Sequence, residues 1–379
     1  MDTIKLFYED SHMKAFTAKV LSCTEEAKGF QILLDATAFY PEGGGQACDL
    51  GTLGEAQVLD VQEKEGLIYH LCDTALPVGA AVEGKIDWDR RFRLMQQHSG
   101  EHIVSGLVHS LFGWHNVGFH MGSQLMTIDF DGPIPAESLQ DIERRANEAV
   151  WANLPVRCWY PDEQTLPTIP YRSKKALPWP VRIVEIPGID NCACCGTHVK
   201  MTGEIGLIKL VSCIKFHAGV RIEMACGCNA LALTQEVFAQ NRAVSQAFSA
   251  KMLETGAAAV KMNEALAAEK LRANTLQSQL FDKTAADFAD QGNVFHFADN
   301  LAPVQVRELA DKIADVCGGW AAVVSGEEGN YSICIVSRRS DVKAIGQALG
   351  ARGGGKPGFF QGNLRSGKAE IEATFAQLL

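Results

Sequence analysis

Short apolar segments alternate with polar turns through the first ninety residues. Their β-branched and aromatic content, bounded by Gly, Asp and Glu-Lys turns, is typical of strands. Five or so strands at this spacing predict a small β-barrel. The expected strands are residues 15–23, 29–39, 54–62, 66–73 and 80–88.

The hydrophobic period changes at about Arg91. Leu94, Ile103, Leu107 and Leu111 recur at helical spacing, and Gly113 closes the segment. A hairpin, an amphipathic helix ending before Pro155 and further strands follow, so the helix is expected to pack on a sheet. The predicted ranges after the helix are 116–132, 135–155, 156–164, 181–188 and 204–227.

The last 150 residues contain two more patterns. Residues 229–290 are rich in Ala, Gln, Glu and Lys and contain no proline, which predicts two long helices in an antiparallel hairpin. Beyond them, strands and helices alternate as in a small α/β layer. The fold class is therefore α+β. The expected domains are a barrel (1–90), a ligand-bearing α/β domain (91–228), a helical hairpin linker (229–290) and a C-terminal α/β domain (291–379).

Composition narrows the class of protein. The chain has 379 residues, 47% hydrophobic and 21% charged, which is typical of soluble globular proteins. It contains no apolar run of about 20 residues, and its first residues lack a basic leader. Twelve cysteines without a signal peptide favour a reducing compartment. We therefore expect a cytoplasmic protein without a membrane partner.

The net charge of −10 argues against nucleic-acid binding unless cations are segregated. They are segregated: residues 338–368 contain seven basic residues and one acid, Asp341. Within this stretch a glycine-rich segment carries Arg352, Lys356 and Arg365 beside Phe359 and Phe360. As a loop it could hold phosphate on backbone N–H groups and cations while the aromatic rings stack on bases.

Two short motifs carry candidate metal ligands. His98 and His102 stand four residues apart on the predicted helix, and Cys194 and His198 repeat the spacing. Three nitrogens and one sulfur are a ligand set that Zn²⁺ accepts in a tetrahedral site. Local packing of His98 and of buried thiols is the alternative. We favour one metal ion per chain, and zinc over iron or copper.

These motifs resemble the editing domain of alanyl-tRNA synthetases and, more closely, the free-standing AlaX editing proteins of the long form, which also carry the synthetase's C-terminal domain. The resemblance rests on two short motifs, HSGEH (98–102, which includes Ser99) and CCGTHV (194–199). Three longer segments agree with it: LDATAFYPEGGGQACDLGTL (34–53), GKIDWDRRFRLMQQHSGEH (84–102) and RIEMACG (221–227). It extends over essentially the whole chain.

The resemblance implies a trans-editing hydrolase that deacylates Ser-tRNA(Ala), Gly-tRNA(Ala) or both, with alanine tRNA as the partner. It also implies tRNA binding and contacts between two copies through the C-terminal domain. The candidate substrate-binding residues are Gly43, Gly44, Gly45, Arg352, Lys356 and Arg365. From sequence alone, residues 41–46 are equally well a wide turn between strands.

The candidate catalytic residues are Thr37, Gln46 and His120. Thr37 is expected to read a serine hydroxyl, Gln46 to border the same pocket, and His120 to stand where synthetases carry a glutamine. Cys195 replaces a glycine of the synthetase pattern and could compete as a ligand. The metal could activate water or only position the substrate, and we favour positioning.

Two other functions are open. A non-catalytic, zinc-stapled tRNA-binding protein would keep the ligands and the basic segment, but it would not need Thr37 or the glycines at 43–45. A phosphoesterase is suggested by the C-terminal domain, but the chain lacks an Asp-His-His cluster. We therefore favour the deacylase.

Overall fold

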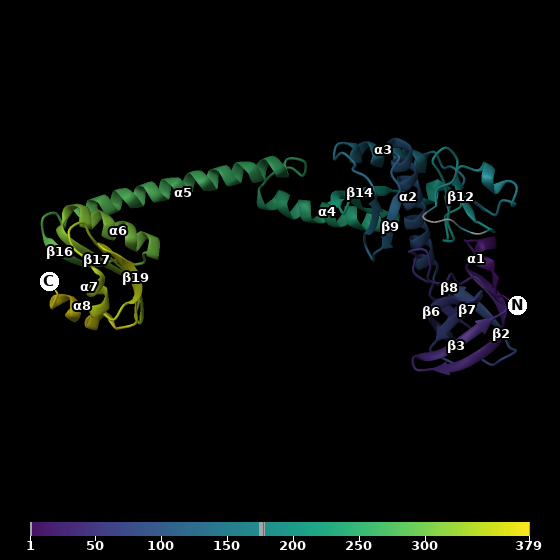
Figure 1. Ribbon diagram of the computed structural model, residues 1–379, viewed down its shortest axis with the longest axis horizontal. Helices are drawn as coiled ribbons and strands as arrows, with labels where there is room; N and C mark the ends of the chain where they lie inside the picture. Colours follow the sequence, from purple (N-terminus) through teal and green to yellow (C-terminus); the bar gives the residue numbers. More distant parts are fainter. Residues whose placement is uncertain (1, 174–176, 178, 379) are drawn as a thin grey trace. The chain divides into compact units, whose positions relative to one another are not determined.

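A computed structural model describes residues 2–173, 177 and 179–378 (Figure 1). The chain forms two compact units, Met1–Ala243 and Val244–Leu379. The first unit contains the predicted barrel and the candidate metal ligands, and the second contains the basic segment. Both mix helices with sheets, so the predicted α+β class is confirmed.

Six antiparallel strands form a closed barrel at the start of the first unit. Strand β2 shows how the sequence gives each strand a buried and an exposed face: Phe16, Ala18 and Val20 are buried in the barrel, while the residues between them are exposed. Two short strands, β1 (Ile4–Lys5) and β4 (Ala36–Thr37), pair in parallel beside helix α1 (Leu6–Glu9). The barrel strands, in order, are β2 (Ala15–Glu26), β3 (Gly29–Leu34), β7 (Leu67–Cys72), β6 (Ala56–Lys64), β5 (Gly51–Leu53) and β8 (Ala81–Ile86).

Helix α2 (Trp88–Phe112) is the central element of the first unit (Figure 1). Asp87 caps its first turn by accepting a hydrogen bond from the N–H of Arg90, and Gly113 ends it in the left-handed conformation. A side chain at Gly100 would begin 2.3 Å from Sγ of Cys226, so glycine lets the helix approach strand β15 closely. The predicted helix is therefore present and largely buried.

Two sheets and helix α3 (Ser138–Trp151) surround α2. The four-stranded sheet has the order β14 (Ile208–Phe216), β15 (Gly219–Cys226), β10 (Met126–Phe130) and β9 (Asn116–Met121). The three-stranded sheet has the order β11 (Arg157–Trp159), β12 (Ile183–Ile186) and β13 (Asp190–Ala193). Two 3₁₀ turns, η1 (Leu166–Thr168) and η2 (Thr202–Ile205), complete the unit. Ile103, Val104 and Val108 bring α2 into the hydrophobic core shared by these elements.

The two long helices predicted after residue 229 are α4 (Cys228–Ala247) and α5 (Thr255–Ala286). The boundary between the two units falls within α4. Their antiparallel packing stays a prediction. No described helix is both long enough and apolar enough to cross a membrane.

The second unit is built on a five-stranded sheet with cores on both faces. Phe281 and Ala285, near the end of α5, join the core beneath α6. The strands, in order, are β16 (Gly292–Phe297), β17 (Gly318–Glu327), β18 (Asn330–Ser337), β20 (Phe359–Leu364) and β19 (Arg352–Lys356). The helices are α6 (Pro303–Val316), α7 (Lys343–Ala348) and α8 (Lys368–Ala376).

The glycine-rich segment of this unit is a strand and not the predicted loop. It pairs with β20 as β19, and a side chain at Gly353 or Gly355 would collide with carbonyl oxygens of β20 at about 2 Å (2.1 and 1.9 Å). Phe359 and Phe360 point to opposite faces and join the two cores, because neighbours in a strand alternate. Phe360 is therefore too deeply buried to stack on a base, whereas stacking by the partly buried Phe359 stays a prediction.

Candidate metal centre

Four side chains from α2 and from the loop after β13 meet in the first unit. His98 and His102 lie one turn apart on α2, and Cys194 and His198 come from the loop. Their ligand atoms all lie within 4.8 Å of one another. Sγ of Cys194 is 3.4 Å from Nε2 of His98 and 3.5 Å from Nε2 of His198. A tetrahedral ion with bonds of about 2.0–2.3 Å separates its ligands by roughly 3.3–3.7 Å, so the cluster fits a metal ion.

Each histidine of the cluster is held from behind through Nδ1. Nδ1 of His102 lies 3.1 Å from the Asp190 carboxylate, and Nδ1 of His198 lies 3.2 Å from the Ser99 hydroxyl. Nδ1 of His98 donates to Oε1 of Gln46 at 2.9 Å, because an amide oxygen only accepts. This leaves Nε2 of each ring for a metal, the arrangement that fixes tautomer and ring orientation in metal sites.

The charges of the cluster suit metal binding. Burial opposes ionisation of the Cys194 thiol, but the histidines around it hold its pKa well below the usual value. Burial lowers the pKa of His198 well below its usual value, which leaves that imidazole neutral. Burial also opposes the charge on His102, yet the Asp190 carboxylate raises its pKa well above the usual value. A bound cation would replace the proton on His102, since metal ligation displaces protons from thiols and imidazoles.

Gln46 is a positioning residue of this centre. Besides accepting from His98, it donates from Nε2 to the Thr197 hydroxyl at 2.8 Å and accepts from the Thr197 N–H at 3.2 Å. Its side chain is buried and fully engaged. Gly196 is needed beside it, because a Cβ there would lie 2.1 Å from Cε1 of His98.

A cavity of about 450 Å³ opens beside the cluster. Its wall includes three candidate ligands, His98, His102 and Cys194, together with Gly44 and Gly45. Both glycines have positive φ (60° and 86°), which other residues rarely adopt. Gly43 is not in the cavity wall; its carbonyl accepts from the Tyr40 hydroxyl within the same turn. The glycine-rich turn therefore brings backbone to the metal cluster.

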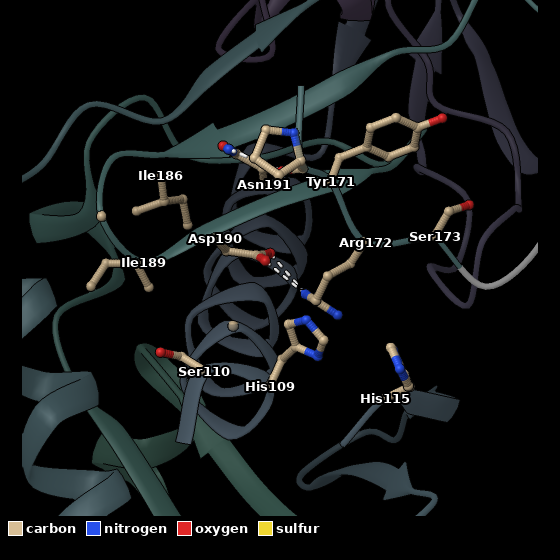
Figure 2. A pocket seen from close by; sticks show the side chains of 13 residues that line it. His109, Ser110, His115, Tyr171, Arg172, Ser173, Ile186, Ile189, Asp190 and Asn191 are labelled. Atoms are coloured by element: carbon tan, nitrogen blue, oxygen red, sulfur yellow. Dashed lines mark hydrogen bonds and ion pairs between the residues drawn. The ribbon is translucent and has the colours of Figure 1, made fainter. Parts of the chain in front are cut away.

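A second hollow of about 510 Å³ lies next to the first and shares His115, Arg172 and Ser173 with it. Figure 2 shows Arg172 directed toward Asp190 in the lining of this hollow, with His109 and His115 below them in the view. Nε and Nη2 of Arg172 donate to the two Asp190 oxygens at 2.7 and 2.8 Å. One carboxylate thus joins the arginine to the metal ligand His102.

Sequence reasoning missed four positioning residues of the centre. Asp190, Arg172 and Ser99 act as described above. Arg182 is buried and donates from Nη1 to the carbonyl oxygens of Cys194 and Gly196, both at 2.9 Å, which holds the ligand loop. Ser99 lies within the HSGEH motif and Asp190 lies four residues before Cys194, so these two stood near a visible signal, whereas Arg172 and Arg182 did not.

The structure brings Thr37 and His120 less close to the cluster than expected. Thr37 is fully buried in the barrel, and its hydroxyl contacts Nε2 of His70 at 2.8 Å and accepts from the N–H of Phe39. His120 is exposed and absent from the cavity wall; its neighbour Phe119 lines the cavity and stacks on His98.

Cys195 lines the cavity but is not one of the four clustered ligands. Its predicted competition with the other ligands remains a prediction. Arg352, Lys356 and Arg365 are exposed in the second unit.

The comparison with known families and relatives agrees with these motifs. The family described as tRNA synthetases class II (A) matches residues 3–90, and the threonyl and alanyl tRNA synthetase second additional domain matches residues 181–223. The alanine–tRNA ligase of Pyrobaculum arsenaticum is 34% identical over 383 residues, covering 95% of this chain and 42% of the ligase.

Two mammalian relatives each match about half of the chain. The alanyl-tRNA editing protein Aarsd1 of Bos taurus is 36% identical over 222 residues, covering 53% of this chain and 49% of that protein. Its counterpart in Rattus norvegicus is 34% identical, covering 54% of each. The chain thus spans less than two thirds of the length of each of these relatives.

The crystal structure of the C-Ala domain from Aquifex aeolicus alanyl-tRNA synthetase aligns with 24% of this chain and 90% of that domain. The identity is 17% and the TM-score 0.21, too low to establish a shared fold. The sequence matches nevertheless extend along almost the whole chain and include both ligand-bearing motifs. The chain is therefore similar in sequence both to alanine–tRNA ligases and to alanyl-tRNA editing proteins.

Proposed function

We propose that this protein is a zinc-dependent aminoacyl-tRNA deacylase that hydrolyses the ester of seryl or glycyl groups on alanine tRNA. The observation that carries the proposal is the cavity of about 450 Å³ whose wall includes three of the four clustered ligands. Its volume lies in the range of small-ligand sites. A ligand cluster used only to staple the fold would not need to open onto such a cavity.

Zinc is the metal that these residues suit best. One thiolate and three imidazoles are borderline-soft ligands that Zn²⁺ binds tetrahedrally, whereas magnesium and calcium prefer oxygen. When bound, zinc supplies Lewis-acid polarisation and orientation of oxygen ligands. Because four protein ligands complete a tetrahedral site, we expect the metal mainly to position the acylated end of the substrate.

The chain's own residues would shape the rest of the site. The positive-φ turn at Gly44 and Gly45 lets a ligand approach the backbone closely. Gln46 and Asp190 would keep two histidine ligands in place. Thr37 would read a serine hydroxyl only by exchanging its hydrogen bond to His70 for one to the substrate.

The choice of tRNA rests on the relatives. Two of them are alanyl-tRNA editing proteins, and others are alanine–tRNA ligases. The exposed cations Arg352, Lys356 and Arg365 would add contacts to tRNA phosphates. We also propose that two copies of the protein contact each other through the C-terminal domain.

A deacylation panel tests the proposal. We expect the zinc-loaded protein to cleave seryl and glycyl esters of alanine tRNA and to spare alanyl esters, with threonine tRNA as a comparison. Cys194→Ala should lose both zinc and activity. Cys228→Ala, at an exposed cysteine outside the cluster, should keep both. Binding of tRNA without cleavage of any ester would favour the non-catalytic alternative.

A further inference from the structure

Glu101 is a buried carboxylate in the wall of the metal-side cavity, and the proposed mechanism has not used it. It lies on α2 between His98 and His102 and is only 5% exposed. Its Oε1 accepts hydrogen bonds from Nδ2 of Asn116 and from the Ser105 hydroxyl, both at 2.5 Å. These two donors fix the carboxylate in one orientation.

The other carboxylate oxygen, Oε2, has no hydrogen-bond donor among the described residues. Arg172 lines the same cavity and its charge also acts on Glu101, but its side-chain hydrogen bonds, from Nε and Nη2, go to Asp190. Asn116 turns its Nδ2 toward Glu101, and its Oδ1 is buried without a partner in the described part of the chain. Buried acceptors are normally paired, so this corner of the cavity requires a ligand that donates hydrogen bonds.

The position of Oε2 limits which donor fits. It lies 3.9 Å from Nε2 of His102, beside the candidate metal position. In an aminoacyl ester the α-nitrogen lies only about 2.5 Å from the carbonyl carbon, given two bonds of about 1.5 Å. An ester carbonyl held at the metal cluster therefore carries its α-ammonium group into reach of this carboxylate. An ammonium group has three donors and no acceptor, which matches the two acceptors, Oε2 of Glu101 and Oδ1 of Asn116.

We propose that Glu101 is the recognition group for the α-ammonium of the acyl ester. This inference rests on the proposed deacylase function and names the substrate class of that site: esters with a free, protonated α-amine. An α-amino group titrates at about 7.7–8.0, and a buried carboxylate favours its charged form. Esters whose amine is acylated or replaced by a hydroxyl lack this charge and are poor substrates.

The test compares two esters that differ only in the α-substituent. Nitrous acid converts seryl-tRNA into the glyceric acid ester of the same tRNA, called here the glyceryl ester. In this ester a hydroxyl of nearly the same size replaces the α-amine. Cleavage of both esters by the full-length, zinc-loaded protein is measured, and each rate is divided by the spontaneous hydrolysis rate of the same ester. We expect the seryl ester to be favoured roughly 10- to 100-fold in kcat/KM, the effect of one charge-assisted hydrogen bond.

The second part of the test compares the Glu101→Gln variant with the wild type on both esters. The zinc content of the variant is measured separately. The variant keeps the shape and removes the charge, so seryl-ester cleavage should fall roughly 10- to 100-fold while glyceryl-ester cleavage changes little. Glu137→Gln, at an exposed position, is the control and should behave like the wild type. Loss of zinc in Glu101→Gln would make the residue a ligand and overturn the inference.

Two results on the esters themselves would also overturn it. One is equal wild-type cleavage of the seryl and glyceryl esters, which needs no variant to fold. The other is equal slowing of both esters by Glu101→Gln. In these cases the deacylase function would stand without the ammonium contact. If the wild type cleaves neither ester, the proposed function fails first and the inference fails with it.

Discussion

The Asp190 carboxylate bridges His102 and Arg172: Oδ2 lies 3.1 Å from Nδ1 of His102, and Oδ1 accepts from Nε of Arg172 at 2.7 Å. Burial would raise the pKa of Asp190, but hydrogen bonds from His102 and Arg172 hold it below the usual value. The carboxylate is therefore ionised. It sets the tautomer of one candidate metal ligand and ties it to the segment that carries Arg172.

Replacing Asp190 by Asn tests this bridge. The amide keeps the shape but loses the charge that holds His102, so zinc affinity should fall about 10- to 100-fold, the usual effect of removing such a partner. Competition with a metal chelator measures the affinity. Asp129→Asn breaks a similar pair with Arg221, outside the ligand cluster and the cavity wall, and should leave the affinity unchanged. Equal affinity in the Asp190 variant and the wild type would show that the bridge does not support the metal.

Thr37 and His70 form a second buried pair, inside the barrel. Nδ1 of His70 lies 3.2 Å from the carbonyl oxygen of Ile32, which only accepts, so the ring proton is on Nδ1. Nε2 then accepts from the Thr37 hydroxyl. We predict that Thr37→Val lowers the free energy of unfolding by about 1–3 kcal/mol, because it leaves a buried nitrogen unpaired.

Chemical denaturation measures the loss of unfolding free energy in Thr37→Val. Deacylation rates on seryl and glycyl esters measure whether the same change affects activity. If Thr37 only stabilises the barrel, Thr37→Val should change the cleavage rates of seryl and glycyl esters equally, because neither substrate contacts the Thr37 hydroxyl. A selective loss on the seryl ester, with zinc content unchanged, would instead place the Thr37 hydroxyl on the substrate. That outcome would contradict a purely structural role.

His70 makes the stability of the barrel depend on pH. Burial disfavours its charged form and lowers its pKa to about 4, compared with about 6.5 in an unfolded chain. Between these values the unfolded state binds more protons than the folded state. The contribution of His70 to stability is therefore complete above pH 6.5 and is lost as the pH falls toward 4, by up to about 3 kcal/mol.

Unfolding experiments at pH 7 and pH 4.5 on the wild type and on His70→Gln measure this term. Glutamine does not titrate, so the variant should lose less stability between the two pH values. Other groups titrate equally in both proteins and cancel in the difference. An identical pH dependence would show that His70 is charged, or hydrated, in the folded state.

The metal ligands could be predicted from sequence because their signals are local. His98 and His102 are one helical turn apart, and Cys194 and His198 lie in one short loop, so each pair needs no knowledge of the fold. The residues that orient them are distant in the chain: Gln46 is 52 residues from His98, and Asp190 is 88 residues from His102. Such contacts are set by the packing of α2 against the barrel and β13, which one sequence does not reveal.

Composition alone was misleading for the glycine-rich segment. Three glycines in a row indicated a loop, whereas in β19 Gly353 and Gly355 avoid collisions with the neighbouring strand. Two adjacent phenylalanines indicated a stacking surface. In a strand such neighbours face opposite ways, and Phe359 and Phe360 each enter a core.

The three cations of this segment are exposed, as phosphate binding would require. Arg352 and Lys356 stand four residues apart on β19, which places both on the same face of the sheet, and Arg365 follows β20. Along β19 only Gly354 lies between them on that face, so no side chain of their own strand stands between the two cations. This geometry, and not a loop, is what would meet RNA.

Replacing Arg352, Lys356 and Arg365 together by Ala should weaken tRNA binding and make the slope of log K against log salt shallower by up to about 2–3. Each phosphate contact that forms releases counterions, so a protein with fewer contacts depends less on salt. Filter binding across a salt series measures the slope. Replacing Lys261, Lys270 and Lys283 of α5 by Ala removes the same charge from another exposed surface. If both triple variants reduce the slope equally, only net charge matters. If the β19 variant leaves the slope unchanged, that face does not bind RNA. We expect the reduction in the β19 variant alone, since counterion release depends on local contacts.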